Sequence, residues 1–286
     1  GRFLMWKITT KAIQKQPITG TSLGGFPAAY AETQAEYMAS GKATEQEKLV
    51  AGCPEYAFNE YLQIGLEQGL VGLALFIGWL GLLFYKGIKN KRYACCGGLM
   101  SLAIFAFSSY PLQLPEFWVV LIFLGVMSVT PDKDEIRENQ AESNGHRWGK
   151  QIFFMGIAIL GIGLFWMQKD HYKAYQQWNK AQMFYNNKAY EAALEVYEPL
   201  YPLLKHKPEF LFEAAQSLSK TGQYEKANEY LERAVLLSSD PMLYYVMAKN
   251  EQCLGEYRQA EKHLLHAIDI LPERIYPYYL LMNLYT

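Results

Sequence analysis

The segment Gly222-Gln-Tyr-Glu-Lys-Ala227 recurs 33 residues later as Gly255-Glu-Tyr-Arg-Gln-Ala260, and 34 residues earlier as Lys188-Ala-Tyr-Glu-Ala-Ala193. A period of this length predicts stacked helical hairpins, each of which buries its apolar face only against its neighbours. The glycine that opens two of the segments permits a tight turn between paired helices. The alanine that closes each segment is small, which suits a point where two helices cross closely. The sequence therefore predicts a helical solenoid.

This pattern resembles the tetratricopeptide repeat, whose period is 34 residues. The resemblance implies an all-α repeat domain over residues 169–286, with three units and the start of a fourth at Ile275-Tyr-Pro-Tyr-Tyr-Leu280. Grooves of such domains usually bind peptides or protein partners, so an envelope protein is the implied partner. Four nearby tyrosines are expected in the core: Tyr244, Tyr245, Tyr278 and Tyr279.

The part of the chain before residue 170 has a different character, because four apolar runs cross it. They are Leu70–Tyr85, Ala94–Tyr110, Phe117–Val129 and Ile152–Met167. A membrane helix needs about 17–25 residues, and apolar flanks extend most of these runs. We therefore predict four transmembrane helices over 69–168, the third being weakest and compatible with a tilted or partly re-entrant helix. The alternative is a set of buried helices in a soluble protein.

The placement of lysine and arginine predicts the orientation, since basic residues remain on the cytoplasmic side. Residues 86–93 carry four bases and no acid, and residues 131–150 carry four more bases, diluted by acids. The link 111–116 carries none. We expect the two basic segments to be cytoplasmic, and residues 1–68, the link and everything after 168 to lie on the opposite face. Two bases oppose this orientation: Lys169 and Lys173.

Composition excludes several functions. The net charge is −1, which argues against nucleic-acid binding. The four cysteines are spaced neither as zinc ligands nor as a disulfide framework. The glycine-rich segment 20–25 predicts a flexible turn without the Gly-Lys-Ser/Thr of a phosphate-binding loop, so we expect no nucleotide, metal or other cofactor. The chain begins at Gly1 rather than Met, and we interpret it as the C-terminal piece of a longer protein.

Residues 1–68 form a sizeable loop ahead of the first apolar run. Residues 2–16 predict an amphipathic helix that Pro17 stops. Pro54 suits the first turn of a later helix. In that helix a polar stripe runs toward the membrane at positions i, i+4 and i+8, formed by Asn59, Gln63 and Glu67. A solvated surface is the alternative interpretation of this stripe.

Four segments, in order, resemble the O-antigen ligase/polymerase family: Gly1-Arg-x-x-x-Trp6, Pro17-Ile-Thr-Gly-x-x-x-Gly-Gly-Phe26, Phe58-Asn-Glu-Tyr-Leu-Gln63 and Glu67-Gln-Gly-x-x-Gly72. The similarity covers residues 1–130, the family's C-terminal portion. It implies further membrane helices upstream and a location in the bacterial inner membrane, with the loop 1–68 and the repeats in the periplasm. It also implies a glycan transferase that uses a polyprenyl-diphosphate-linked glycan, without nucleotide sugar or obligatory metal. The acceptor is a lipid, a polysaccharide or a protein.

The resemblance assigns roles to particular residues. Arg2 matches the family's loop arginine, and its guanidinium fork suits the charge that develops on a diphosphate leaving group. The resemblance assigns substrate binding to the side chains of the polar stripe, Asn59, Gln63 and Glu67. Many ligases have His where this chain has Phe58, which cannot accept a proton. Either Glu60 or Glu55 then serves as the base, or the base lies upstream, or catalysis rests on diphosphate stabilisation alone.

A second function fits the spans and repeats equally well. The chain is then a non-enzymatic, membrane-anchored scaffold whose tetratricopeptide repeats recruit envelope proteins. Further apolar runs upstream would favour the transferase, whereas a signal anchor near Gly1 would favour the scaffold.

Overall fold

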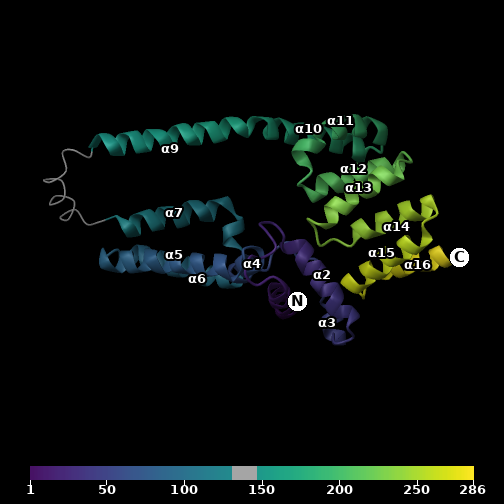
Figure 1. The fold of residues 1–286 in the computed structure, drawn as a ribbon, viewed down its shortest axis with the longest axis horizontal. Helices are drawn as coiled ribbons and strands as arrows, with labels where there is room; N and C mark the ends of the chain where they lie inside the picture. The colour runs from purple at the N-terminus through teal and green to yellow at the C-terminus, as the bar shows by residue number, and fades with distance from the viewer. Residues whose placement is uncertain (131–146) are drawn as a thin grey trace.

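The computed structural model describes residues 1–130 and 147–286, with the backbone alone for 147–154. Every regular element in these residues is a helix, which confirms the all-α prediction. Figure 1 shows an N-terminal group of short helices, a set of long apolar helices beside it, and a curved stack of paired helices that ends at the C-terminus. Most of the predicted 131–150 connection, residues 131–146, lies outside the described part.

The N-terminal helices form a small domain, which we call the loop domain (residues 1–68). Its helices are α1 (Arg2–Lys15), α2 (Phe26–Ala39), α3 (Glu45–Leu49) and α4 (Glu60–Glu67). α1 ends just before Pro17, as predicted. Buried side chains from α1, α2 and α4 form one core, including Ile8, Phe26, Tyr30 and Leu66.

A close approach of two backbones joins this domain to the apolar helices. Gly20 and Gly69 both have φ of +69°, and the left-handed Gly69 separates α4 from the next helix. A Cβ atom on Gly69 would lie 2.1 Å from the carbonyl oxygen of Ile18. The Leu70 amide donates to the Pro17 carbonyl at 2.8 Å. Glycine is required at residue 69 because only a bare Cα fits both the space and the left-handed backbone.

The apolar helices pack as a group of three with a fourth apart. They are α5 (Gly69–Lys89), α6 (Tyr93–Ser108), the 3₁₀ turn η1 (Pro111–Gln113), α7 (Pro115–Val129) and α9 (Arg147–Met167). By length and composition α5 is the one helix in the searched, described residues that is long enough to cross a membrane; α6 and α7 are shorter apolar helices. Leucine and phenylalanine side chains of α5, α6 and α7 form their shared core.

The connections between these helices fall at two opposite ends. The Asn90 side-chain amide donates to the carbonyl oxygens of Ser128 and Val129, at 3.0 and 3.1 Å, so the α5–α6 turn lies beside the end of α7. At the other end η1 contacts α4 through Glu60. Figure 1 shows the loop domain and the repeats at that second end. The basic turn 90–92 and the link 111–113 therefore lie at opposite ends of the helices.

The repeat region folds as the predicted helical hairpins. Its helices are α10 (Lys169–Asn186), α11 (Tyr190–Leu204), α12 (Pro208–Lys220), α13 (Tyr224–Val235), α14 (Met242–Leu254), α15 (Tyr257–Ile270) and α16 (Ile275–Tyr285). Gly222 and Gly255 turn between paired helices with φ of 82° and 80°, and Lys188 takes the same left-handed conformation in the first unit. The crossing alanines are fully buried: Ala193, Ala227 and Ala260.

The expectation for the four tyrosines holds only in part. Tyr245 is buried, and Tyr244 is half-buried. Tyr278 and Tyr279 are exposed, so the expectation of a core position was wrong for these two. They lie on α16, which packs on the α14–α15 hairpin through its other side chains, Leu280, Leu281 and Leu284.

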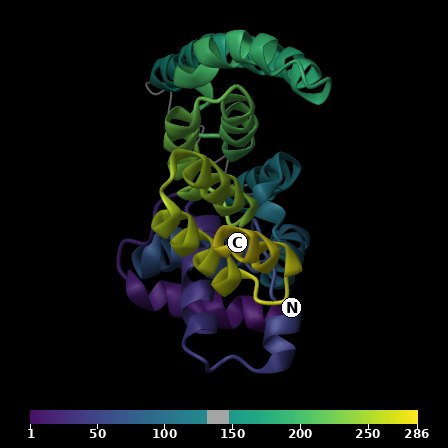
Figure 2. The same ribbon diagram turned by 90° about the vertical axis from the view of Figure 1, so that its right-hand side faces the viewer.

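The solenoid docks on the loop domain through its C-terminal helices, far along the chain from the apolar helix α9 that precedes it. The side-chain amide of Gln34 on α2 donates to the carbonyl oxygens of Ile270, at 2.8 Å, and Gly52, at 3.1 Å. Tyr30 donates to the oxygen of the same amide at 2.7 Å. Figure 2, turned by 90° from Figure 1, again shows the C-terminal helices beside the N-terminal ones. The described chain thus closes on itself through a buried polar contact.

We expect Gly69→Ala to destabilise the protein by about 2 kcal/mol or more, because the substitution adds both left-handed strain and a clash with Ile18. Thermal unfolding of the purified protein measures the change. Gly78→Ala is the matched control, since a Cβ there meets nothing within 4 Å and alanine favours the helix. Equal unfolding midpoints for Gly69→Ala and the unsubstituted protein would contradict the requirement for glycine.

Candidate functional site

Arg2 lies at the start of α1, beside the end of α6. Its Nη1 donates to the carbonyl oxygen of Ser108 at 3.2 Å. Ser108 is the last residue of α6, so the guanidinium meets the negative end of that helix dipole. The guanidinium carbon lies 5.5 Å from the ring centroid of Phe58. The side chain remains exposed, and the guanidinium N–H groups that do not bond Ser108 are available to a ligand.

Three aromatic rings form a chain of contacts that begins at Arg2. We call these residues, Phe58, Tyr110 and Tyr56, the aromatic platform. Phe58 and Tyr110 meet edge to face, with centroids 4.9 Å apart. Tyr110 and Tyr56 stack at 5.2 Å with an interplanar angle of 18°. Tyr110 comes from the link between α6 and α7, and the other two come from the segment before α4. A cation and three rings therefore gather where the loop domain meets the apolar helices.

Phe58 has an unusual backbone conformation. Its φ of 49° is left-handed, which costs about 1–2 kcal/mol for a residue with a side chain. Asn59 then adopts an extended conformation, and its Oδ1 accepts from the Leu62 amide at 3.0 Å as the N-cap of α4. The helix therefore begins at Glu60. The prediction that Pro54 belongs to the first turn of this helix was wrong, because the left-handed Phe58 prevents a helix from passing through it.

Glu60 holds the link between α6 and α7. It is 1% exposed, and its two oxygens accept from the Leu112 amide at 2.6 Å and from the Gln113 side-chain amide at 3.2 Å. Burial raises the pKa of this carboxyl; hydrogen bonding to Leu112 and Gln113 opposes the rise, and the charge of Glu67 adds to it. Glu60 thereby positions the link that carries Tyr110.

The side chains of the predicted polar stripe follow one face of α4. They form hydrogen bonds within the protein instead of facing solvent or a ligand. Gln63 accepts from the Ala57 amide at 2.8 Å and donates to Glu67 at 2.7 Å. Both residues are buried. Burial raises the pKa of Glu67, and hydrogen bonds from Gln63 and from the backbone of Gly24 and Phe26 oppose the rise. Because Phe26 begins α2, Glu67 connects the end of α4 to the positive end of α2.

Glu55 directly precedes the first residue of the aromatic platform in the chain. Its side chain is exposed, in contrast to Glu60. Burial raises the pKa of the neighbouring Tyr56 hydroxyl; the Glu55 carboxylate adds to the rise, and Lys207 of the repeats opposes it. The aromatic platform therefore lies within the electrostatic reach of the repeat domain.

Of the residues that the sequence singled out, Arg2 and Phe58 lie in contact. Glu60 is buried and does not face solvent. Sequence reasoning missed Tyr56 and Tyr110. The Tyr-Pro pair at 110–111, in a short link between two apolar runs, was the available signal for Tyr110. In the described residues no group of three His, Cys, Asp or Glu side chains is placed to hold a metal ion.

Comparison with protein families agrees with the resemblance found in the sequence. Residues 1–77 match the family model described as O-Antigen ligase. Residues 186–267 match the model described as Anaphase-promoting complex, cyclosome, subunit 3, over the repeat region. No curated protein matches the chain. The chain is thus similar to an O-antigen ligase over its first quarter and carries appended tetratricopeptide-type repeats.

Solved structures that resemble the chain include the Yersinia enterocolitica type III secretion chaperone SycD. In complex with a peptide of the translocator YopD, SycD is 20% identical, over 39% of this chain and 86% of that chain, with a TM-score of 0.35. An alternative dimer of the same chaperone is 21% identical over the same shares, with a TM-score of 0.34.

The buried Glu60 predicts a pH dependence of stability. Since burial raises its folded pKa above the ordinary value of 4.5, its contribution to the free energy of unfolding is full below pH 4.5 and is lost as pH rises through the folded pKa. Glu60→Gln removes this titration. Its amide can still accept from Leu112 and donate to a rotated Gln113 side chain. We expect the unfolding midpoint of Glu60→Gln to fall less between pH 4.5 and 7.5 than that of the unsubstituted protein.

Thermal unfolding across this pH range makes the comparison. The exposed Glu229→Gln is the control and is expected to keep the original pH slope. An unchanged slope in Glu60→Gln would show that Glu60 does not titrate in this window.

Proposed function

We propose that this chain, which joins an O-antigen ligase-like segment to helical repeats, is part of a glycan transferase of the bacterial inner membrane. The donor is a glycan on a polyprenyl diphosphate, and the acceptor is a hydroxyl of a lipid, polysaccharide or protein. The observation that carries the proposal is the exposed guanidinium of Arg2, held at the end of an apolar helix beside the aromatic platform.

The position of Arg2 suits a lipid-linked donor. The polyprenyl chain of such a donor belongs in the hydrocarbon, and its diphosphate belongs at the polar boundary. Arg2 binds the last residue of the apolar helix α6, which is where that boundary falls if α6 spans the membrane. A planar, permanently charged fork binds two phosphate oxygens at once. As the glycosidic bond breaks, Arg2 stabilises the negative charge that collects on the diphosphate.

We propose a division of labour between the two carboxylates. Both oxygens of Glu60 bind the link, and the side chain is buried, so Glu60 positions Tyr110. Glu55 is exposed next to the platform residue Tyr56, so it is the carboxylate that can reach an acceptor hydroxyl and take its proton. Asn59, Gln63 and Glu67 support the site by fixing α4 and the segment before it.

We propose further that four helices span the membrane: α5, α6, α7 and α9. The placement of the basic turn 90–92 and the link 111–113 at opposite ends supports a cytoplasmic turn and a periplasmic link. The loop domain and repeats then share the periplasmic side with the link. The repeats supply a docking surface for an envelope protein, and the scaffold alternative keeps that surface without the transfer reaction.

We expect Arg2→Ala in the complete protein to lower the rate of glycan transfer about 10²–10³-fold, because one preorganised donor to developing charge contributes this much. Arg2→Lys should recover little, since lysine cannot form the bidentate contact. The readout is the polysaccharide ladder of cells that depend on the variant gene, with membrane levels checked by immunoblot. Arg258→Ala is the control, an exposed arginine on α15. Normal ladders with Arg2→Ala would reject the transferase and favour the scaffold.

The assignment of the carboxylates is tested in the same cells. We expect Glu55→Gln to reduce transfer at least about 10²-fold, as loss of a general base does. Glu60→Gln should retain transfer to within a few-fold, because the link remains hydrogen-bonded. The reverse result, with Glu60→Gln inactive and Glu55→Gln active, would exchange the two roles. Full activity in both variants would place the base elsewhere.

A further inference from the structure

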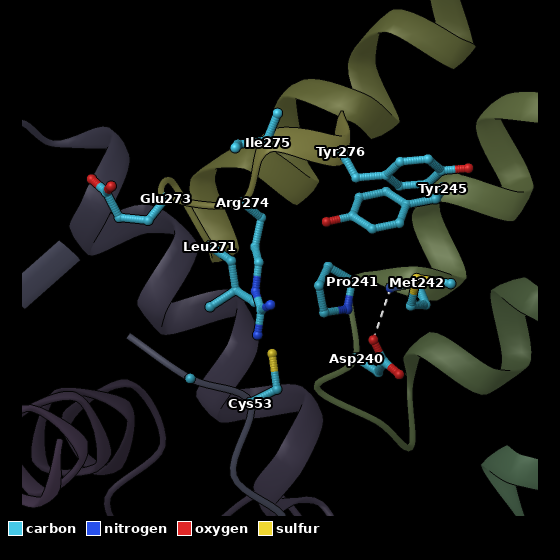
Figure 3. A pocket seen from close by; sticks show the side chains of 11 residues that line it. Cys53, Asp240, Pro241, Met242, Tyr245, Leu271, Glu273, Arg274, Ile275 and Tyr276 are labelled. Atoms are coloured by element: carbon cyan, nitrogen blue, oxygen red, sulfur yellow. Dashed lines mark hydrogen bonds between the residues drawn. The ribbon is translucent and has the colours of Figure 1, made fainter. Parts of the chain in front are cut away.

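A cavity of about 940 Å³ lies where the repeats dock on the loop domain. One wall is the loop-domain segment Gly52–Cys53, and the others come from the α13–α14 connection, α14 and the α15–α16 connection. Figure 3 shows this cavity with the side chains that line it. Its volume is in the range of small-molecule sites. Neither the proposed transfer chemistry nor the packing of the repeats uses this space.

Groups of opposite charge face this cavity. Figure 3 shows Arg274 extending from the α15–α16 connection toward Cys53, with Asp240 on the α13–α14 connection opposite and the Tyr245 hydroxyl directed into the same space. Glu273 points away. In the described residues no carboxylate lies within ion-pair distance of Arg274. The Asp240 carboxylate accepts from the Met242 amide at 2.9 Å through Oδ1, which leaves its second oxygen available to a ligand.

The thiol and the tyrosine hydroxyl of the cavity are neutral. Burial raises the pKa of the Cys53 thiol to about 12; Asp240 adds to the rise, and Arg274 opposes it. Burial likewise raises the pKa of Tyr245 to about 12. The rings of Tyr245 and Tyr276 meet at 5.4 Å, beside the apolar side chain of Leu271. The cavity thus offers one cation, one anion, neutral donors and aromatic surface, while the carboxylate of Glu273 is directed away from it.

We propose that this cavity binds an uncharged glycan segment, the acceptor chain of the proposed transferase. Each sugar hydroxyl both donates and accepts hydrogen bonds, so neighbouring hydroxyls can satisfy Arg274 and Asp240 together. The apolar C–H faces of a sugar ring pack on tyrosine and leucine. An anionic ligand would be attracted by Arg274 but would bring its negative charge close to the Asp240 carboxylate. Repulsion from that carboxylate would offset the attraction.

The route from the cavity to the transfer site is short. Gly52 and Cys53 line the cavity, and the same segment continues to Tyr56 and Phe58 of the aromatic platform. Cys53 and Phe58 are five positions apart in the chain, which places them no more than about 18 Å apart even in a fully extended chain. An acceptor chain held in the cavity is therefore kept close to Arg2. This role as acceptor site rests on the proposed function, whereas glycan binding itself does not.

A peptide is the other class of ligand that repeat domains bind, and the cavity fits it less well. Peptide grooves present a series of apolar sockets for alternate side chains. Here a single open cavity carries a cation and an anion on facing walls, and it includes residues from outside the repeats. The observations favour the glycan.

The test is a binding measurement on the complete protein in nanodiscs of phosphatidylethanolamine and phosphatidylglycerol, since maltoside detergents would present sugars of their own. The probe is the neutral oligosaccharide fraction released by mild acid from the host's surface polysaccharide. We expect saturable binding by calorimetry. Hydrogen exchange should slow in residues 52–54 and 271–276. Arg274→Gln should weaken binding at least about tenfold, and Tyr245→Phe should weaken it several-fold.

Arg258→Gln is the matched control, because it removes an exposed arginine from the same domain without touching the cavity, and its affinity should remain within twofold. Absence of oligosaccharide binding would overturn the inference, as would binding that Arg274→Gln leaves unchanged. Protection of residues 52–54 and 271–276 by a mixture of synthetic decapeptides, but not by the oligosaccharide, would also overturn it.

The two proposals fail separately. If Arg2→Ala abolishes transfer while the oligosaccharide does not bind, the transferase stands and the glycan cavity is rejected. If Arg2→Ala transfers normally while the oligosaccharide binds with the expected dependence on Arg274, the cavity stands as a glycan site, and its role as the acceptor site of a transferase is rejected.

Discussion

The helix α4 must bury two carboxylates, and this constraint organises the N-terminal half of the protein. A buried carboxylate is costly unless hydrogen-bond donors replace its water. In the described residues neither Glu60 nor Glu67 has an ion pair with lysine or arginine, so amides supply those donors. Glu60 takes them from the link between α6 and α7, and Glu67 takes them from Gln63 and the start of α2. One short helix thereby fixes the loop domain to the apolar helices.

The site inherits its geometry from this arrangement. With the link held by Glu60, Tyr110 meets Phe58, and Phe58 meets Arg2. The strained Phe58 persists because Asn59 and Gln63 fix the backbone on both sides of it. The repeats approach the same segment from the other side, through Gln34 and the cavity wall at Gly52. A single irregular segment, residues 52–58, connects the two places where a donor and an acceptor are proposed to bind.

Local signals were enough to predict the repeats. The turn glycines and crossing alanines act within one hairpin, and their spacing is visible in the sequence. The face of α4 that carries Asn59, Gln63 and Glu67 was also predictable, since it follows from helical periodicity. What this face meets was not predictable, because the partners of Gln63 and Glu67 are amides of other elements. The helix start at Glu60 depends on the left-handed Phe58, for which a phenylalanine gives no signal. The docking of Gln34 on Ile270 joins residues far apart in the chain, and no local pattern specifies such a pair.

The passage from α9 into α10 has a mechanical consequence. Gln168 between them keeps a helical backbone, and Figure 1 shows the two helices as nearly one rod. At 1.5 Å per residue, residues 147–186 extend about 60 Å. One end of the solenoid is fixed to this rod, and its far end is fixed to α2. Because the solenoid is held at both ends, a displacement of α9 that moves the start of the solenoid would be resisted at the contact between α15 and α2, beside residues 52–58.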